Sequence, residues 1–331
     1  MIQGSKSWID THPYLYHYTA EAGFKGILES NALRATYFAD LNDSREIHEL
    51  QKPFAAALTS RLVPIVGELR RSSHQLNKKV SELGGNVGAA KQFADSWVNS
   101  LYRSTFSMEA KAETYCCVTS FCSHATDQPY EQENGLLSQW RGYGTNGGIC
   151  LVFDARKLSA QLATERASYF YLHTDLRPVH YYIEGSPLTD EFGQLLQLSE
   201  DIMRSAIVGG RDFDPSKVFE PFVTTATTYK HRGFYEEREV RLIAMAATQA
   251  TIDRIKHKEG FKEEPVKALF TLKRKGSDRH YIELFGKDFS PLPLERVIVG
   301  PSLDQDKRFE FAKGLVPKGV AVSKSATPFI G

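Results

Sequence analysis

Two carboxylates and one guanidinium alternate in a short segment that leads into an apolar run. Glu237, Glu239 and Arg241 are spaced two residues apart and precede Leu242 and Ile243. On a strand that begins near Glu237, residues at this spacing share one face of the sheet. Because charges removed from water need partners, the segment predicts either a salt-bridged sheet surface or a functional site. One such carboxylate could stabilise a cationic, oxocarbenium-like sugar centre, as in glycosidases.

A second group of polar and aromatic residues lies near the middle of the chain. Ser120 ends a β-prone run, and Trp140, Arg141 and Tyr143 follow an acidic loop. Trp140 and Tyr143 present flat faces that can stack on a planar heterocycle, and Arg141 can pair with a phosphate in a bidentate way. A Trp140 side chain packed in the core is the structural alternative.

The N-terminal part contains two further polar segments. His17-Tyr18-Thr19 closes an aromatic, β-prone run, and a His and a Thr near a strand end can hydrogen-bond a ribose or an amide. A half-buried histidine with satisfied hydrogen bonds is the alternative. After residue 40, Asp43 and Glu46 have the spacing of a capping-box variant, which predicts a helix N-terminus.

Three glycines match a dinucleotide-binding pattern in the wrong structural context. Gly142, Gly144 and Gly147 fit G-x-G-x-x-G, but that fingerprint needs a strand before it and a helix after it. Here a helical pattern at 136–141 precedes the glycines and an apolar, β-prone run at 148–153 follows them. This order argues against a Rossmann site and predicts a tight loop that enters a strand.

The segment between residues 44 and 110 has a helical sequence pattern. Apolar residues recur there at spacings of three and four, which is helical periodicity. These residues are Phe54, Leu58, Leu62, Ile65 and Leu69, then Phe93, Trp97 and Leu101. We expect two or three inserted helices that pack on the helices predicted at 188–208 and 216–228.

Short strands and helices are interspersed along the rest of the chain. A helix is predicted at 20–30 with Thr19 as its N-cap. Extended segments are predicted at 13–19, 32–38, 115–121, 148–153, 169–172, 179–182, 239–246, 268–272, 281–285, 296–300 and 320–324. Because no regular βαβ rhythm is present, an α+β fold is favoured over a doubly wound sheet. We expect one elaborated domain over 1–331, with 44–110 as a helical insertion.

Composition narrows the class of protein. Lys and Arg number 41 and Asp and Glu 40 in a chain of 331 residues, so the net charge of +1 gives no broad basic surface for a phosphate backbone. The four cysteines (Cys116, Cys117, Cys122 and Cys150) lack C-x-x-C spacing, which predicts buried free thiols and no zinc site. No signal-peptide core and no run of about 18 apolar residues is visible. A cytoplasmic protein without membrane contact and without a bound metal is therefore expected.

Four motifs, taken in order, resemble a bacterial domain-of-unknown-function family that is grouped with the ADP-ribosyltransferase-like folds. They are H-Y-T, L-N-D-x-x-E ending at Glu46, S-x-W-x-x-Y-G before a G-x-C-L-x-F strand, and K-x-x-x-F-x-x-E-x-E-x-R-L-I. The last motif begins at Lys230. The resemblance spans about residues 14–300 and implies a split β-sandwich that holds NAD in a cleft.

The resemblance also implies roles for individual residues. His17 would engage the adenosine ribose and the nicotinamide amide, and Tyr143 or Trp140 would stack on the nicotinamide. Glu239 would bond the nicotinamide ribose and support the departure of nicotinamide. The second-strand Tyr of the family's H-Y-E pattern has no clear counterpart here, and Ser120 stands where an alternative pattern has a serine.

The expected activity is NAD-dependent ADP-ribosyl transfer to a protein or nucleic-acid acceptor, or NAD hydrolysis, in a bacterial toxin or phage-defence effector. NAD would be a substrate. The expected catalytic residues are Glu239 and Glu237, and the expected NAD-binding residues are His17, Tyr18, Thr19, Ser120, Trp140, Arg141 and Tyr143. One alternative is a non-catalytic nucleotide- or protein-binding module on the same fold. Another is a nucleic-acid enzyme, which the neutral charge and the lack of a carboxylate cluster disfavour.

Overall fold

The computed structural model divides the chain into two compact units. It describes residues 7–41, 46–72, 74–107, 113–124, 127–144, 147–183, 190–208, 216–257, 264–273 and 278–328. Unit 1 comprises 1–41, 117–179 and 233–331, and unit 2 comprises 42–116 and 180–232. Helices are combined with a mixed sheet whose strand pairs are mostly antiparallel in the described part of the chain, so the predicted α+β class is confirmed.

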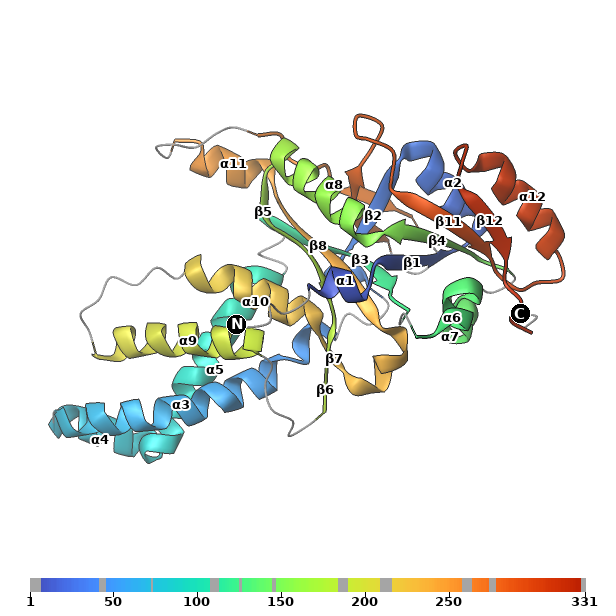
Figure 1. The fold of residues 1–331 in the computed structure, drawn as a ribbon. Helices are drawn as coiled ribbons and strands as arrows, with labels where there is room; N and C mark the ends of the chain where they lie inside the picture. Colours follow the sequence, from blue (N-terminus) through green and yellow to red (C-terminus); the bar gives the residue numbers. More distant parts are fainter. Residues whose placement is uncertain are drawn as a thin grey trace, which may run out of the picture. The chain divides into compact units, whose positions relative to one another are not determined.

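Unit 1 is built on a sheet that has ten strands among the described residues (Figure 1). The strands are β1 (Tyr14–Thr19), β2 (Ala32–Tyr37), β3 (Thr114–Cys122), β4 (Ile149–Asp154), β5 (Tyr171–Pro178), β8 (Glu239–Ala247), β9 (Phe270–Leu272), β10 (Arg279–Phe285), β11 (Leu294–Val299) and β12 (Ala321–Lys324). Their order is β12-β11-β4-β1-β3-β2-β10-β9, with β8 paired to both β3 and β5. The sheet therefore branches at β3, which pairs with β1 at Cys122, with β2 at Cys117 and Val118, and with β8.

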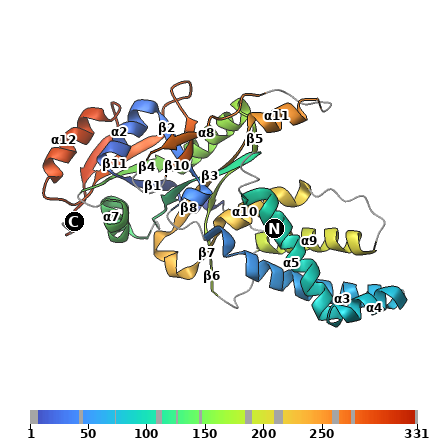
Figure 2. The ribbon, with the colours of Figure 1, turned by 180° about the vertical axis from the view of Figure 1, so that it is seen from behind.

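Helices cover both faces of the central strands. On one face lie α2 (Glu21–Ser30), α8 (Ala155–Ser168) and α12 (Gln305–Leu315), and on the other lie α6 (Pro129–Asn134) and α7 (Leu137–Tyr143) (Figure 1). Figure 2 shows α2 beside α12, whose Phe24 and Phe311 rings are 6.2 Å apart. Shorter helical turns of unit 1 are α1 (Trp8–Thr11), η1 (Phe38–Asp40), η4 (Arg232–Glu237) and α11 (Gln249–Ile255). Because side chains alternate along a strand, β1 sends Tyr16 and Tyr18 toward α7 and sends Thr19 toward α2, where it contacts Gly23.

The segment after the glycine-rich loop is a strand, as predicted. Strand β4 begins at Ile149, and its residues through Phe153 are fully buried between β1 and β11. A helix would have been required here by a dinucleotide-binding turn, so the argument against a Rossmann site is confirmed. The predicted N-cap at Thr19 is wrong. Thr19 pairs with Ile149 as the last residue of β1, and Ala20 caps α2 instead.

Unit 2 is mainly helical. Its helices are η2 (Glu46–His48), α3 (Gln51–Ser72), α4 (His74–Glu82), α5 (Gly85–Phe106), α9 (Asp190–Val208) and α10 (Ser216–Thr228), and its strands β6 (His180–Tyr182) and β7 (Tyr229–His231) pair in parallel. The predicted helices are present, and α3 packs on α9 as expected. The predicted buried face of α5 is wrong by one residue: Ala90, Ala94, Val98 and Tyr102 are buried, whereas Phe93, Trp97 and Leu101 are half-buried. The small alanines suit close packing of α5 against α3.

Two further expectations concern caps and cysteines. The capping residue predicted at Asp43 lies outside the described residues. The nearby Asp40 binds another part of unit 1: it accepts hydrogen bonds from the backbone N (2.6 Å) and Nδ1 (2.7 Å) of His280. Cys116, Cys117, Cys122 and Cys150 are buried free thiols, as predicted. Among the described helices, none combines the length and apolar character that crossing a bilayer requires.

We expect Gly148→Val to lower the free energy of unfolding by about 1–3 kcal/mol. A Cβ at Gly148 would lie 2.5 Å from the Gly144 Cα and 3.1 Å from the Thr19 carbonyl oxygen, so backbone would have to move. Gly142 in α7 is the matched control, because a Cβ there meets nothing within 4 Å. Gly142→Ala should stabilise the helix by about 0.5–1 kcal/mol. Urea denaturation measures both effects, and a Gly148→Val variant as stable as the wild type would contradict this packing.

Candidate functional site

A buried ion pair stands at the start of β8. The Arg241 guanidinium donates from Nε to Glu239 Oε1 at 2.8 Å and from Nη2 to Glu239 Oε2 at 2.9 Å. Each residue is only 5% exposed. The predicted shared strand face is thus confirmed for these two residues. A guanidinium in bidentate contact fixes the orientation of the carboxylate.

Glu237 does not share that face, and the prediction that placed it there is wrong. It is the last residue of η4, not part of β8, and it is half-buried. The reason is Arg238, which has a φ of +42° and so interrupts the extended backbone between the two glutamates. Alternation along a strand applies only after this residue.

His17 and Ser120 are brought together by the pairing of β1 with β3. The His17 ring donates from Nδ1 to the backbone carbonyl of Ser120 at 3.0 Å, because a carbonyl can only accept. Burial lowers the pKa of His17, so the ring is neutral near pH 7 and its Nε2 carries a lone pair. Ser120 contributes its backbone to this contact, and its side chain is exposed.

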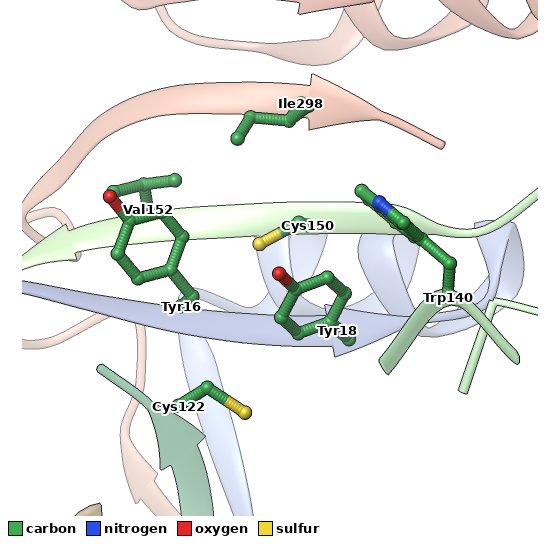
Figure 3. Close-up of a cluster of buried hydrophobic side chains, with 7 residues drawn as sticks. All are labelled: Tyr16, Tyr18, Cys122, Trp140, Cys150, Val152 and Ile298. Atoms are coloured by element: carbon green, nitrogen blue, oxygen red, sulfur yellow. The ribbon is translucent and has the colours of Figure 1, made fainter. Parts of the chain in front are cut away.

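Tyr18 and Trp140 meet on the α7 face of the sheet, within the cluster shown in Figure 3. Their rings are 4.7 Å apart and nearly perpendicular, at 78°. The Tyr18 hydroxyl accepts from the Leu136 backbone N at 2.8 Å, and Trp140 Nε1 donates to the Asn134 carbonyl at 2.9 Å. Tyr18 and Trp140 therefore have internal partners for their polar atoms.

Trp140 is enclosed in the core, so the prediction that it could stack on a planar ligand is corrected. Its exposed fraction is 0%. A Cβ added at Gly135, Gly144 or Gly300 would lie 2.8–2.9 Å from the indole ring, so three backbone segments close over it. Tyr143, three residues later, is 50% exposed, and Arg141 is also exposed. Of the two aromatic candidates, Tyr143 is the accessible one.

Two residues of the family-like motifs meet in unit 2. Lys230 Nζ lies 3.0 Å from Glu46 Oε1, and Lys230 is only 4% exposed. Glu46 is the last residue of the motif L-N-D-x-x-E, and Lys230 is the first residue of the motif K-x-x-x-F-x-x-E-x-E-x-R-L-I. Their buried ion pair gives both motifs a structural role in unit 2, joining η2 to β7.

A buried polar network that the sequence did not reveal lies beside Tyr16 and Tyr18. His124 Nε2 is 3.1 Å from the Tyr18 hydroxyl, and its ring lies 3.9 Å from the Tyr16 ring. Burial, with smaller contributions from the nearby Arg238 and Arg296 charges, lowers the pKa of His124 to about 3. Arg296 donates to the Tyr16 hydroxyl at 3.0 Å, and burial raises the pKa of Tyr16 to about 12. The network thus holds a neutral histidine between two un-ionised tyrosines.

We expect His124 to destabilise the fold as the pH falls. Its pKa is about 3 in the folded chain and 6.5 ordinarily, so between these values the unfolded state binds the extra proton. The free energy of unfolding should therefore fall by about 1.4 kcal/mol per pH unit from this group. His124→Gln should remove this component from the slope measured by urea denaturation between pH 6 and 4. The exposed His74→Gln is the control, and equal slopes for His124→Gln and wild type would contradict the assignment.

The candidate residues form separate groups in unit 1. Glu239 pairs with Arg241, His17 with Ser120, and Tyr18 with Trp140. Thr19 is half-buried against α2. His17 and Tyr18 leave β1 on opposite faces, so His17 and Trp140 do not line one surface. Within the described parts of the chain, no group of three or more His, Cys, Asp or Glu side chains is placed to hold a metal ion.

Residues 139–242 match the model of a family described as a protein of unknown function, DUF2971. The matched segment begins next to Trp140 and includes Glu237, Glu239 and Arg241. The predicted resemblance to a domain-of-unknown-function family is therefore confirmed. No curated protein and no solved structure matches the chain.

Proposed function

We propose that the chain cleaves NAD and transfers ADP-ribose to a protein or nucleic-acid acceptor, or to water. The glycosidic bond between nicotinamide and ribose breaks, and its electron pair leaves with neutral nicotinamide. A nucleophilic atom of the acceptor forms the new bond to the ribose and releases its proton. Glu239 stabilises the positive charge that builds on the ribose. The observation that supports this proposal is the carboxylate of Glu239, which Arg241 holds through two hydrogen bonds inside the family-matched segment.

The sheet supports the finer fold assignment, an ADP-ribosyltransferase-like split β-sandwich. β3 pairs with β1, β2 and β8, so the strands diverge into two branches from one shared strand. Glu239 starts β8, one of the diverging strands.

The remaining candidate residues would each have a different role in binding NAD or the acceptor. The His17 Nε2 lone pair could accept from a ribose hydroxyl, on the face of β1 opposite Tyr18. Tyr143, which is 50% exposed, takes the stacking role, and the exposed Arg141 would pair with the diphosphate. Glu237 is half-buried, directly before the left-handed residue Arg238, and would orient the acceptor. In a bacterial cytoplasm this activity would suit a toxin or a phage-defence effector.

A second candidate function is a non-catalytic nucleotide- or protein-binding module on the same fold. The observation that favours it is the engagement of both Glu239 oxygens by Arg241, in a pair that is 5% exposed at each residue. A carboxylate enclosed in this way would reach a substrate only after the pair opens.

Nicotinamide release separates the two candidates. Pure protein is incubated with NAD, with and without a bacterial lysate as a source of acceptors, and free nicotinamide is quantified by chromatography. Release above the protein-free background supports cleavage, and dependence on the lysate supports transfer. Calorimetric binding of NAD without release would support the module instead. If neither nicotinamide release nor NAD binding is observed, an NAD-directed function is contradicted.

A further inference from the structure

We infer that Glu131 and Arg238 are positioning residues, which hold the Glu239 carboxylate in the orientation that NAD cleavage requires. This inference rests on the proposed function. Arg238 directly precedes Glu239 and has a φ of +42°, in the left-handed region that non-glycine residues avoid. A backbone held there against its preference is a known feature of functional sites, where the surrounding structure must over-determine it.

Hydrogen bonds fix Arg238 from several directions. Its carbonyl accepts from both the backbone N and the Oγ of Ser123, each at 2.9 Å. Its own backbone N donates to the Tyr235 carbonyl at 3.1 Å. Its guanidinium donates from Nη1 to Glu131 Oε2 at 2.8 Å. The end of β3, the turn η4 and helix α6 together therefore hold this one residue.

The left-handed residue Arg238 separates the turn η4 from strand β8, and Glu239 is the first residue of that strand. With an extended residue at 238, Glu237 and Glu239 would share a face and η4 would run on as strand. The left-handed Arg238 instead ends η4, and β8 begins at Glu239, whose side chain shares a strand face with Arg241 because the two residues are two positions apart. The Glu131 and Arg238 side chains are 24% and 29% exposed, so their ion pair can be removed without leaving a fully buried charge.

The test compares Glu131→Gln and Arg238→Gly with Glu133→Gln, an exposed glutamate on the same helix. Glycine adopts a positive φ freely, so Arg238→Gly keeps the left-handed backbone accessible but loses the guanidinium. We expect kcat for nicotinamide release to fall roughly 10- to 100-fold in both variants, because small displacements of a reacting group cost this much. KM for NAD and the melting temperature should stay near the wild-type values, and Glu133→Gln should match the wild type.

A double-mutant cycle separates positioning from general stability. In a Glu239→Gln background, Glu131→Gln should cause no further loss, since it acts only through Glu239. Wild-type kcat in both single variants, or a rise in KM in place of the fall in kcat, overturns the inference and leaves the role of Glu239 standing. If Arg238→Gly does not fold, Glu131→Gln alone decides. A wild-type protein that releases no nicotinamide overturns the proposed function and this inference together.

Discussion

Glu239→Gln is expected to reduce nicotinamide release from NAD by roughly 100- to 1,000-fold, the usual loss for a group that stabilises charge in a transition state. The amide keeps the shape of the side chain, and its oxygen can still accept one hydrogen bond from Arg241. It cannot carry the negative charge that opposes the cationic ribose. KM for NAD should change less than kcat, because the charge on the ribose develops only in the transition state.

The control for this prediction is Glu310→Gln, which removes one charge from an exposed position on α12. It should retain wild-type turnover. Glu239→Gln also removes the carboxylate that pairs with the buried Arg241 guanidinium, so circular dichroism and a melting curve must show that the variant is folded under assay conditions. A folded Glu239→Gln protein with wild-type turnover would assign a purely structural role to the carboxylate.

The strand segments were predictable because burial leaves a strong pattern in the sequence. Strand β4 was expected at 148–153 and spans Ile149–Asp154, and the residues that make it a strand are continuously apolar and fully buried. Helix α3 followed from its regular spacing, since Phe54, Leu58, Leu62 and Ile65 all face the core. In both elements one periodicity dominates the local sequence.

Helix α12 was missed because few of its described residues face the core. In α12 the buried residue among those described is Ala312, and one small apolar residue gives no periodic signal. Helix α8 buries a glutamate: Glu165 is fully enclosed, with Lys267 Nζ at 2.5 Å and the Tyr171 hydroxyl at 2.8 Å. From the sequence alone a glutamate predicts a solvent-exposed position, because its partner Lys267 lies about a hundred residues away.

The candidate site shows the same limit. The pairing of Glu239 with Arg241 is local, and a spacing of two residues was enough to predict it. The exclusion of Glu237 depends on the backbone of Arg238, which is held by Ser123 and Glu131. Those two residues are 115 and 107 positions away along the chain. The partners that decide the geometry of β8 therefore carry no local signal.

The enclosure of Trp140 leads to the second large effect. Trp140→Ala should lower the free energy of unfolding by about 3–5 kcal/mol, because removing a fully buried indole leaves a cavity that the fold fills only in part. The glycines at 135, 144 and 300 surround the ring with backbone, so little can move inward to replace it. The exposed Tyr143→Ala is the matched comparison, with an expected stability change within about 0.5 kcal/mol.

When NAD cleavage is measured, we expect a change at Tyr143 to affect KM more than a change at Trp140. If Tyr143 stacks on the nicotinamide, Tyr143→Ala removes a contact of about 1–3 kcal/mol, which raises KM roughly 5- to 150-fold. A conservative Trp140→Phe variant keeps most of the buried ring and should leave KM unchanged while the melting temperature falls. A rise in KM for Trp140→Phe, with none for Tyr143→Ala, would mean that the indole reaches the ligand. The glycine cage around Trp140 would then have to open when NAD binds.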